Sequence, residues 1–359
     1  MDLTNILSKL VSFKTYDGNS NKAGAVEDLY KYYLNNIDQT TYKHKIVSRN
    51  GSKSLVVYSK SLKNPAIVLQ SHIDVVPGKS EQFKPFKKKG KLFGRGASDM
   101  KFAAAVYLKL LDELKTQDLD IAVWLTDDEE IGGFDGVNYL LNESGFSCDF
   151  CLLPDGVNNN SIVTDAKGVQ FLKITSKGKP AHGSMPWLGK NAVDNLINAY
   201  NEIKKLSILN VKKKQTWVNT LNLGLINGGE ATNTVPDQAS AHLDFRFVNN
   251  NAHAIFMKDV REIVKKYDLE MEDIIYGDSY SLERGNKHIK NYEKALREEN
   301  VQFQYAQDHG SSDARFFNSK GIPVLMHKPI CGGDHSESEW IDIESLEKYY
   351  KVILNFLSK

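Results

Sequence analysis

The chain has 359 residues, of which 41% are hydrophobic and 25% charged, the balance of a globular protein with one large domain or two ordinary ones. Its formal net charge of +1 provides no broad basic field for nucleic acid. No apolar run approaches the roughly 20 residues of a membrane span, and no secretory signal is visible at the N-terminus. The three cysteines supply no disulfide framework. These features predict a cytoplasmic protein that binds neither nucleic acid nor a membrane.

The chain begins with helical patterns that alternate with short β-rich runs. Asp2 and Thr4 are suited to cap a first helix that runs to Leu10. The expected helices that follow span residues 23–34, 102–114 and 134–141, and the expected strands span 55–58, 66–70, 121–125 and 150–153. Strands that alternate with helices predict an α/β sheet with helices on both faces.

From about Gly168 the pattern becomes that of a smaller α+β insert. Its expected strands span 169–175, 217–225, 239–247 and 271–276, and its expected helices span 191–206 and 252–266. The alternation predicts an antiparallel sheet that can leave one face free. The first pattern then returns, with helices at 287–298 and 343–357 and strands at 301–305 and 323–326. The sequence therefore predicts a mixed-sheet catalytic domain of residues 1–167 and 283–359, interrupted by a lid domain of residues 168–282.

Five short segments, far apart in the chain, carry side chains that bind metals. They are Ser71–Pro77, Gly94–Lys101, Thr126–Gly133, Pro154–Gly156 and Gly332–His335. Together they offer two imidazoles and several carboxylates, a mixture of nitrogen and oxygen ligands that suits a divalent cation such as zinc. Several of them follow apolar strands, and ligands bind at the carboxyl ends of strands in open α/β sheets. The set predicts a two-metal hydrolase site.

Three of the candidate residues also allow simpler explanations when taken alone. The His-x-Asp spacing of His72 and Asp74 suits a metal ligand and the carboxylate that orients it, but it also suits a surface histidine beside a turn. Asp99 precedes an Ala-rich helix, so it could cap that helix. In the context of the other segments, one carboxylate there could bridge two cations about 3.5–4 Å apart.

The four consecutive acids from Asp127 to Glu130 follow an expected strand. An exposed acidic loop is one interpretation of such a run. In the other, one glutamate binds the metal and its neighbour acts as general base toward a water whose pKa the metal lowers to about 7. Asp155 and His335 lie in turns after strands, where each could supply one more oxygen or nitrogen to the same sheet edge.

These residues, in this order, resemble the M20 family of metallopeptidases and amidohydrolases over nearly the whole chain. The resemblance implies two Zn²⁺ per chain, with Co²⁺ or Mn²⁺ as alternatives. It assigns His72 and Asp155 to one ion, Glu130 and His335 to the other, Asp99 as the bridge, Glu129 as general base and Asp74 as the group that orients His72. One departure is Phe102, where the family usually has glycine, and we expect it to narrow the floor of the cleft.

The insert resembles the lid and dimerisation domain of the same family. Its Gly178–Ser184 segment implies that His182 reaches into the active site of a partner subunit and stabilises the oxyanion there. Asn233 and Arg246 resemble contacts to a substrate carboxylate, although Arg246 could equally be an outward strand residue. Gly310 and Ser311 resemble a substrate loop. The resemblance thus implies a homodimer.

The implied reaction is hydrolysis of an amide bond next to a free carboxylate, in a small N-acyl amino acid or short peptide. A deacetylase or desuccinylase type of deacylase is the first interpretation. A dipeptidase or carboxypeptidase is an alternative that the sequence does not separate from it, because both reactions use the same centre. A non-catalytic, metal-dependent binding protein would be expected to have lost a ligand or the base, and all of them are present here.

Overall fold

The computed structural model describes residues 2–209 and 217–359, and the chain divides into two compact units. The first unit contains Met1–Thr164, Ser281–Ala306 and Ser312–Lys359, and the second contains Asp165–Tyr280 and Gln307–Ser311. The boundaries expected from the sequence lie a few residues from these divisions. The short segment Gln307–Ser311, which we expected in the catalytic domain, is grouped with the second unit.

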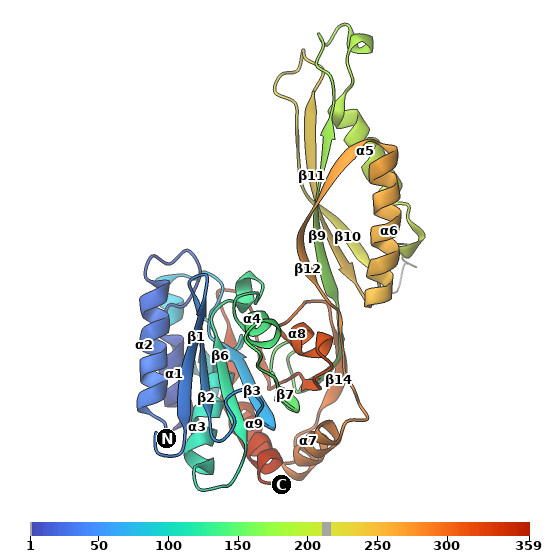
Figure 1. Ribbon diagram of the computed structural model, residues 1–359. Coiled ribbons are helices and arrows are strands. Elements are labelled where there is room, and N and C mark those ends of the chain that lie inside the picture. The colour runs from blue at the N-terminus through green and yellow to red at the C-terminus, as the bar shows by residue number, and fades with distance from the viewer. Residues whose placement is uncertain (1, 210–216) are drawn as a thin grey trace. The chain divides into compact units, whose positions relative to one another are not determined.

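A six-stranded mixed sheet forms the centre of the first unit (Figure 1). In the order β1-β2-β6-β3-β7-β15, its strands are β1 (Lys43–Arg49), β2 (Ser52–Tyr58), β6 (Ile121–Thr126), β3 (Ile67–His72), β7 (Phe150–Leu152) and β15 (Val324–Leu325). The last four run parallel, whereas β1 and β2 are antiparallel to their neighbours. The carboxyl ends of β6, β3 and β7 therefore meet at one edge of the sheet.

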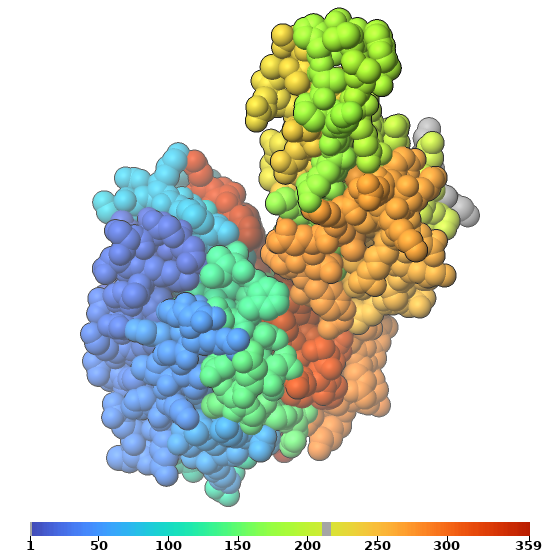
Figure 2. Space-filling model, turned by 45° about the horizontal axis from the view of Figure 1, so that its top comes forward, coloured from blue at the N-terminus to red at the C-terminus, as the bar shows by residue number. Residues whose placement is uncertain are grey.

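Helices from both ends of the chain pack on this sheet. They are α1 (Leu3–Val11), α2 (Lys22–Asn35), α3 (Lys101–Leu114), α4 (Val137–Asn142), α7 (Lys287–Glu298), α8 (Ala314–Ser319) and α9 (Ile343–Leu357). Asp2 caps α1 as expected, because its carboxylate accepts the Thr4 N–H at 2.8 Å. In the space-filling view of Figure 2, the blue-to-green N-terminal part and the red C-terminal part share one body of atoms. The mixed α/β class predicted from the sequence is confirmed.

Two smaller sheets lie mainly in the first unit. One has the order β17-β18-β5-β4, and in the other β8 pairs with β13, β14 and β16. Their strands are β4 (Phe86–Lys88), β5 (Lys91–Phe93), β8 (Ser161–Ala166), β13 (Tyr280–Ser281), β14 (Gln304–Asp308), β16 (His327–Lys328), β17 (Cys331–Gly332) and β18 (Trp340–Asp342). Most of these strands have only two or three residues, too few to show a periodic pattern in the sequence.

The second unit contains a four-stranded antiparallel sheet with two helices. In the order β10-β11-β9-β12, the strands are β10 (Thr220–Gly228), β11 (Gln238–Phe247), β9 (Gly168–Lys177) and β12 (Leu269–Gly277). The helices α5 (Ala192–Ile203) and α6 (Asn250–Lys266) bury Leu196 and Phe256 against Phe245 of β11. β10 begins at Thr220, three residues later than expected. Among the helices of the described segments, none has the length and apolar character that crossing a membrane requires.

Candidate metal centre

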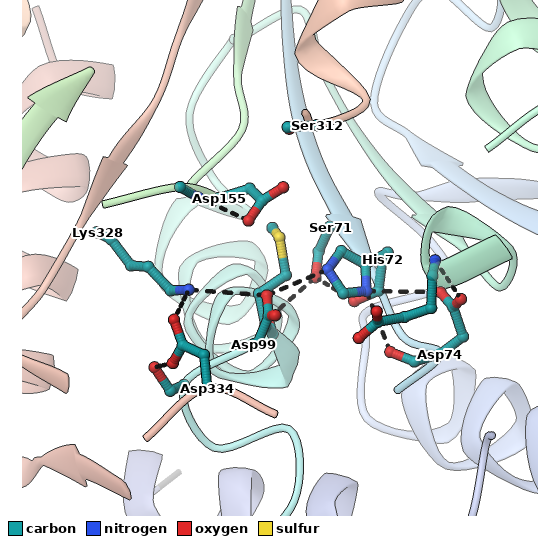
Figure 3. A network of polar contacts seen from close by, with 12 residues as sticks. Ser71, His72, Asp74, Asp99, Asp155, Ser312, Lys328 and Asp334 are labelled. Atoms are coloured by element: carbon teal, nitrogen blue, oxygen red, sulfur yellow. Dashed lines mark hydrogen bonds and ion pairs between the residues drawn. The ribbon is translucent and has the colours of Figure 1, made fainter. Parts of the chain in front are cut away.

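The sheet brings the candidate ligands to one edge because three parallel strands end there. His72 is the last residue of β3, Asp155 follows β7, and the acidic run begins directly after Thr126, the last residue of β6. Two connecting loops add Asp99, just before α3, and His335, between β17 and β18. Segments that are far apart in the sequence thus supply side chains to one region of the first unit (Figure 3).

Five of the predicted residues form two groups that could each hold a metal ion. His72, Asp99 and Asp155 form one group, and Asp99, Glu130 and His335 form the other, with potential ligand atoms within 4.8 Å of one another in each. Asp99 Oδ1 lies 3.5 Å from His72 Nε2, whereas Asp99 Oδ2 lies 3.1 Å from His335 Nε2. One carboxylate therefore faces both groups, an arrangement that allows it to bridge two cations.

The donor atoms are suited to a cation. Within the described residues, His72 Nε2, Asp99 Oδ1 and Glu130 Oε1 are buried and have no hydrogen-bond partner. Leaving such atoms unsatisfied is costly, and a bound cation would remove that cost. Hydrogen bonds to Asp99 and Glu130 raise the pKa of His335 to about 10. Burial lowers the pKa of His72, but the carboxylates of Asp74 and Asp99, each 3.5 Å from the ring, more than offset it and raise this pKa well above its usual value. Both imidazoles therefore face an environment that favours positive charge.

Asp74 links two of the candidate ligands. The His72 Nδ1 atom lies 3.1 Å from the Asp74 carbonyl oxygen and 3.5 Å from its carboxylate Oδ1. The other carboxylate oxygen accepts the backbone N–H of Glu130 at 2.9 Å. Contacts of this kind on Nδ1 fix the ring so that Nε2 points at the proposed metal. The geometry thus supports the orienting role proposed for Asp74.

The four consecutive acids divide into two pairs with different surroundings. Asp127 accepts the Lys53 N–H at 2.9 Å, and Asp128 accepts two backbone N–H groups, those of Asp135 and Gly136, at 2.8 Å. Burial raises the pKa of Asp127 to about 7. These two carboxylates hold the loop, and the turn that follows them carries Glu129 and Glu130.

Glu129 has the electrostatic environment of a base that takes up a proton readily. Burial raises the pKa of its carboxyl well above the usual value. His72 opposes this shift, whereas Asp155 and Asp313 add to it. A carboxylate with a raised pKa accepts a proton from water more easily than an exposed one.

Glu339 positions Asp99, a role that the sequence did not reveal. Its side chain is buried and accepts the backbone N–H groups of Ser98 and Asp99 at 2.9 and 3.0 Å, while Arg95 Nη1 donates to it at 2.8 Å. The alternative in which Asp99 caps α3 is wrong, because Met100 is the N-cap residue and no side chain caps this helix. The sequence carries no signal for this role, because the hydrogen bonds of Glu339 join it to a loop 240 residues earlier.

Lys328 is the other residue that sequence reasoning missed. It is 1% exposed, and its Nζ lies 3.1 Å from Asp334 Oδ2 and 3.7 Å from Asp99 Oδ1 (Figure 3). A lysine in a two-residue strand carries no sequence signal for such a position. Phe102 also differs from expectation. It is fully buried and packs edge-on against Tyr349, so it fills the core and does not narrow a cleft.

The remaining predicted residues belong to the second unit and fall into two places. His182 and Asn233 lie together, because His182 forms a β-bridge with Thr234 and Gly183 N–H donates to the Asn233 carbonyl at 2.7 Å. Both are exposed. This place lies beside Gln238, where β11 begins, whereas Arg246 lies eight residues further along that strand. At about 3.4 Å per residue, Gln238 and Arg246 are roughly 27 Å apart along the strand.

Gly310 and Ser311 belong to the short segment that joins the Arg246 end of this sheet. Asp308, whose carboxylate accepts the Gly310 N–H at 2.8 Å, also accepts the Lys167 N–H through its carbonyl oxygen at 3.1 Å. Lys167 directly precedes β9, whose Val169 pairs with Arg246. Within one chain, the structure therefore groups Arg246 with Gly310 and Ser311, and it does not bring Asn233 to them.

A mixed sheet with two candidate donor groups that share one carboxylate at its carboxyl edge is the arrangement expected of a metal-dependent hydrolase. Residues 68–359 match peptidase family M20/M25/M40, and the chain belongs to this family. The resemblance inferred from the five segments is thereby confirmed.

Curated relatives and solved structures agree with this assignment. The chain is 28% identical to succinyl-diaminopimelate desuccinylase of Rickettsia bellii (strain RML369-C), with 99% of this chain and 95% of the relative covered. It is also 28% identical to the Rickettsia felis enzyme of that name, with 98% of each covered. A Staphylococcus aureus tripeptidase has the same fold, with a TM-score of 0.81, 21% identity, and 99% and 97% coverage. An M20 family metallo-carboxypeptidase from Sulfolobus solfataricus also has this fold, with a TM-score of 0.80 and 18% identity. The match covers 99% of this chain and 98% of that one.

Proposed function

We propose that this protein hydrolyses an amide bond next to a free carboxylate, as an N-acyl-amino-acid deacylase with two divalent cations per chain. The main observation in support is that Asp99 belongs to both donor groups. One of its carboxylate oxygens lies near the imidazole of His72 and the other near that of His335. Zinc is the cation expected from this donor set, with Co²⁺ or Mn²⁺ as alternatives.

The residues of the first unit have defined parts in this reaction. His72 and Asp155 would hold one cation, Glu130 and His335 would hold the other, and Asp99 would be shared by the two sites. Bound there, the cations would polarise the scissile carbonyl and acidify a water molecule. Glu129 takes the proton of the attacking water and returns it to the leaving amine, and its raised pKa suits both transfers.

The second units of two chains would together supply the substrate contacts of one active site. Arg246, with its planar guanidinium, is suited to hold a substrate carboxylate with Gly310 and Ser311 beside it. His182 and Asn233 lie toward the other end of β11, whose first residue is roughly 27 Å from Arg246 along the strand. We therefore assign them to the active site of the partner subunit, where His182 stabilises the oxyanion.

The surface of the second unit favours β10 as the dimer edge. Leu225 and Ile226 of this edge strand are 58% and 50% exposed, and the strand contains no charged residue. The other edge strand, β12, carries Glu270, Glu272 and Asp273, and charged side chains prevent edge strands from pairing. An uncharged edge with exposed apolar side chains is suited to pair with a second copy of itself.

A dipeptidase or carboxypeptidase is the second candidate function. The structures named tripeptidase and metallo-carboxypeptidase have the same fold at 21% and 18% identity. The curated relatives covered over nearly their whole length are named for desuccinylation, which favours the deacylase. A cytoplasmic location is also proposed, because Cys148, Cys151 and Cys331 are buried free thiols, as suits a reducing compartment.

Two linked measurements test the proposal. Metal content is measured by mass spectrometry on the purified protein, and hydrolysis is assayed with N-acetyl amino acids, N-succinyl amino acids and dipeptides. We expect about two zinc ions per chain and turnover of the N-acyl class. Turnover restricted to dipeptides would select the second candidate. A protein that binds no metal and hydrolyses nothing after addition of zinc, cobalt or manganese would contradict both.

A further inference from the structure

A buried ammonium group lies against the carboxylate that faces both donor groups. Lys328 Nζ is 3.7 Å from Asp99 Oδ1, the same oxygen that lies 3.5 Å from His72 Nε2. The other oxygen of Asp99 faces His335 and is 3.1 Å from its Nε2. The ammonium therefore lies next to the donor group of His72, Asp99 and Asp155 (Figure 3). The other donor group, that of Asp99, Glu130 and His335, uses the Asp99 oxygen that Lys328 does not contact.

The position of Lys328 is fixed by its surroundings. The side chain is 1% exposed, and its backbone is held in β16, where Lys328 pairs with Ser161 of β8. Its ammonium also contacts Asp334 Oδ2 at 3.1 Å, and Ser98 Oγ donates to the other oxygen of Asp334. A lysine so enclosed has its amino group held beside Asp99 and cannot turn it into solvent.

This charge acts against a metal ion bound nearby. An ammonium group has no lone pair, so it cannot be a ligand. It attracts the lone-pair density of Asp99 Oδ1 that a cation would use, and it would repel a divalent cation bound to that oxygen. Asp334 compensates part of this charge, but its carboxylate is 28% exposed and is partly screened by solvent.

We propose that Lys328 makes the two metal sites unequal, so that the site of His72, Asp99 and Asp155 binds its cation more weakly than the site of Asp99, Glu130 and His335. The inference rests on the proposed function, because it assumes that both donor groups hold metal. It assigns Lys328 as a positioning residue that acts through Asp99 and sets the order in which the two ions bind.

The test is a titration of the metal-free, full-length protein with Co²⁺. Binding is monitored by calorimetry and by the visible absorption of the bound ion. We expect two binding steps in the wild type. Lys328→Met removes the charge at nearly constant length and is expected to tighten the weaker step by about ten-fold or more, with the tighter step changed less. The control is Lys109→Met, since Lys109 pairs with Glu347 on the partly exposed side of α3, and both steps should keep their affinities.

A second variant acts in the opposite direction and keeps the test valid if Lys328→Met fails to fold. Asp334→Asn leaves the ammonium less compensated, so it should weaken the same step by about ten-fold. If the wild type binds two Co²⁺ and both variants bind them with unchanged affinities, the role of Lys328 is overturned and the proposed function stays intact. No Co²⁺ uptake by the wild type would overturn the proposed function as well.

Discussion

Glu129 is the residue whose removal tests the chemistry most directly. We expect Glu129→Gln to lower kcat by a factor of about 10² to 10⁴, because the amide cannot accept the proton of the attacking water. The metal content should not change, since Glu129 belongs to neither donor group. Steady-state kinetics and metal analysis of the same preparation check both expectations. Glu81→Gln, an exposed position, is the control, and a near-normal kcat for Glu129→Gln would contradict the mechanism.

Glu339 tests the idea that a residue outside the donor groups holds Asp99 in place. Glu339→Gln removes the charge that pairs with Arg95 and weakens the hydrogen bonds to the N–H groups of Ser98 and Asp99. We expect a loss of metal affinity of about 10- to 100-fold, measured with a competing chelator. Glu337→Gln, two residues away on the exposed part of the same loop, should keep the wild-type affinity. Equal affinities in the two variants would contradict this role.

At the residue scale, the sequence was most informative where chemistry coincides with strand ends. His72 and Asp155 could be predicted because each follows an apolar run, and Glu130 because it follows a third such run. Lys328 could not be predicted, because only the pairing of β16 with β8 places its ammonium near Asp99. Neither could Glu339, whose hydrogen bonds to a loop 240 residues earlier depend on the fold.

Among the elements, the contact of α7 and α9 with β16 contains a buried histidine. His327 is 1% exposed, its Nδ1 is 2.9 Å from the Tyr292 hydroxyl, and its ring lies near that of Tyr349. Burial lowers the pKa of His327 to about 3. The unfolded chain, with a histidine pKa of about 6.5, therefore binds a proton that the folded protein excludes.

The sign of the resulting pH dependence follows from this difference. The contribution of His327 to stability is fully present above about pH 6.5 and is lost as the pH falls toward 3, at about 1.4 kcal/mol per pH unit. We expect the free energy of unfolding, measured with urea in the presence of a chelator, to fall between about pH 6.5 and 5 in the wild type. The fall should be steeper than that of His327→Gln by about 1.4 kcal/mol per pH unit. The exposed His44→Gln should match the wild-type slope. Parallel profiles for wild type and His327→Gln would contradict the prediction.

The elements that the sequence did not reveal share a physical reason. β1 has the sequence Lys-His-Lys-Ile-Val-Ser-Arg and is largely exposed, so its strand state depends on pairing with β2 and not on an apolar pattern. The helix α8 has six residues, fewer than periodicity can identify. By contrast, β6 is buried along its whole length and α3 is rich in alanine and leucine, and both were found close to their observed bounds.

At the scale of the whole molecule, the sheet of the second unit separates residues that are expected to contact one substrate. His182 and Asn233 lie by the start of β11, and Arg246 lies near its end. A single strand cannot bend to bring these positions together, so one chain would supply only part of the substrate contacts in its own active site. Two copies related by a two-fold axis would each supply the missing part to the other.

The proposed dependence on a second copy predicts a variant that separates assembly from metal binding. Ile226→Lys places a charge on the apolar edge strand β10, where it should prevent pairing with the same strand of another copy. We expect analytical ultracentrifugation to show a monomer, with kcat/KM at least 10²-fold lower, as for loss of an oxyanion contact, and with metal content unchanged. Ile274→Lys, at a similarly exposed position on the opposite edge strand β12, is the matched control and should remain a fully active dimer. A monomeric Ile226→Lys variant with normal activity would show that His182 acts within its own chain or not at all.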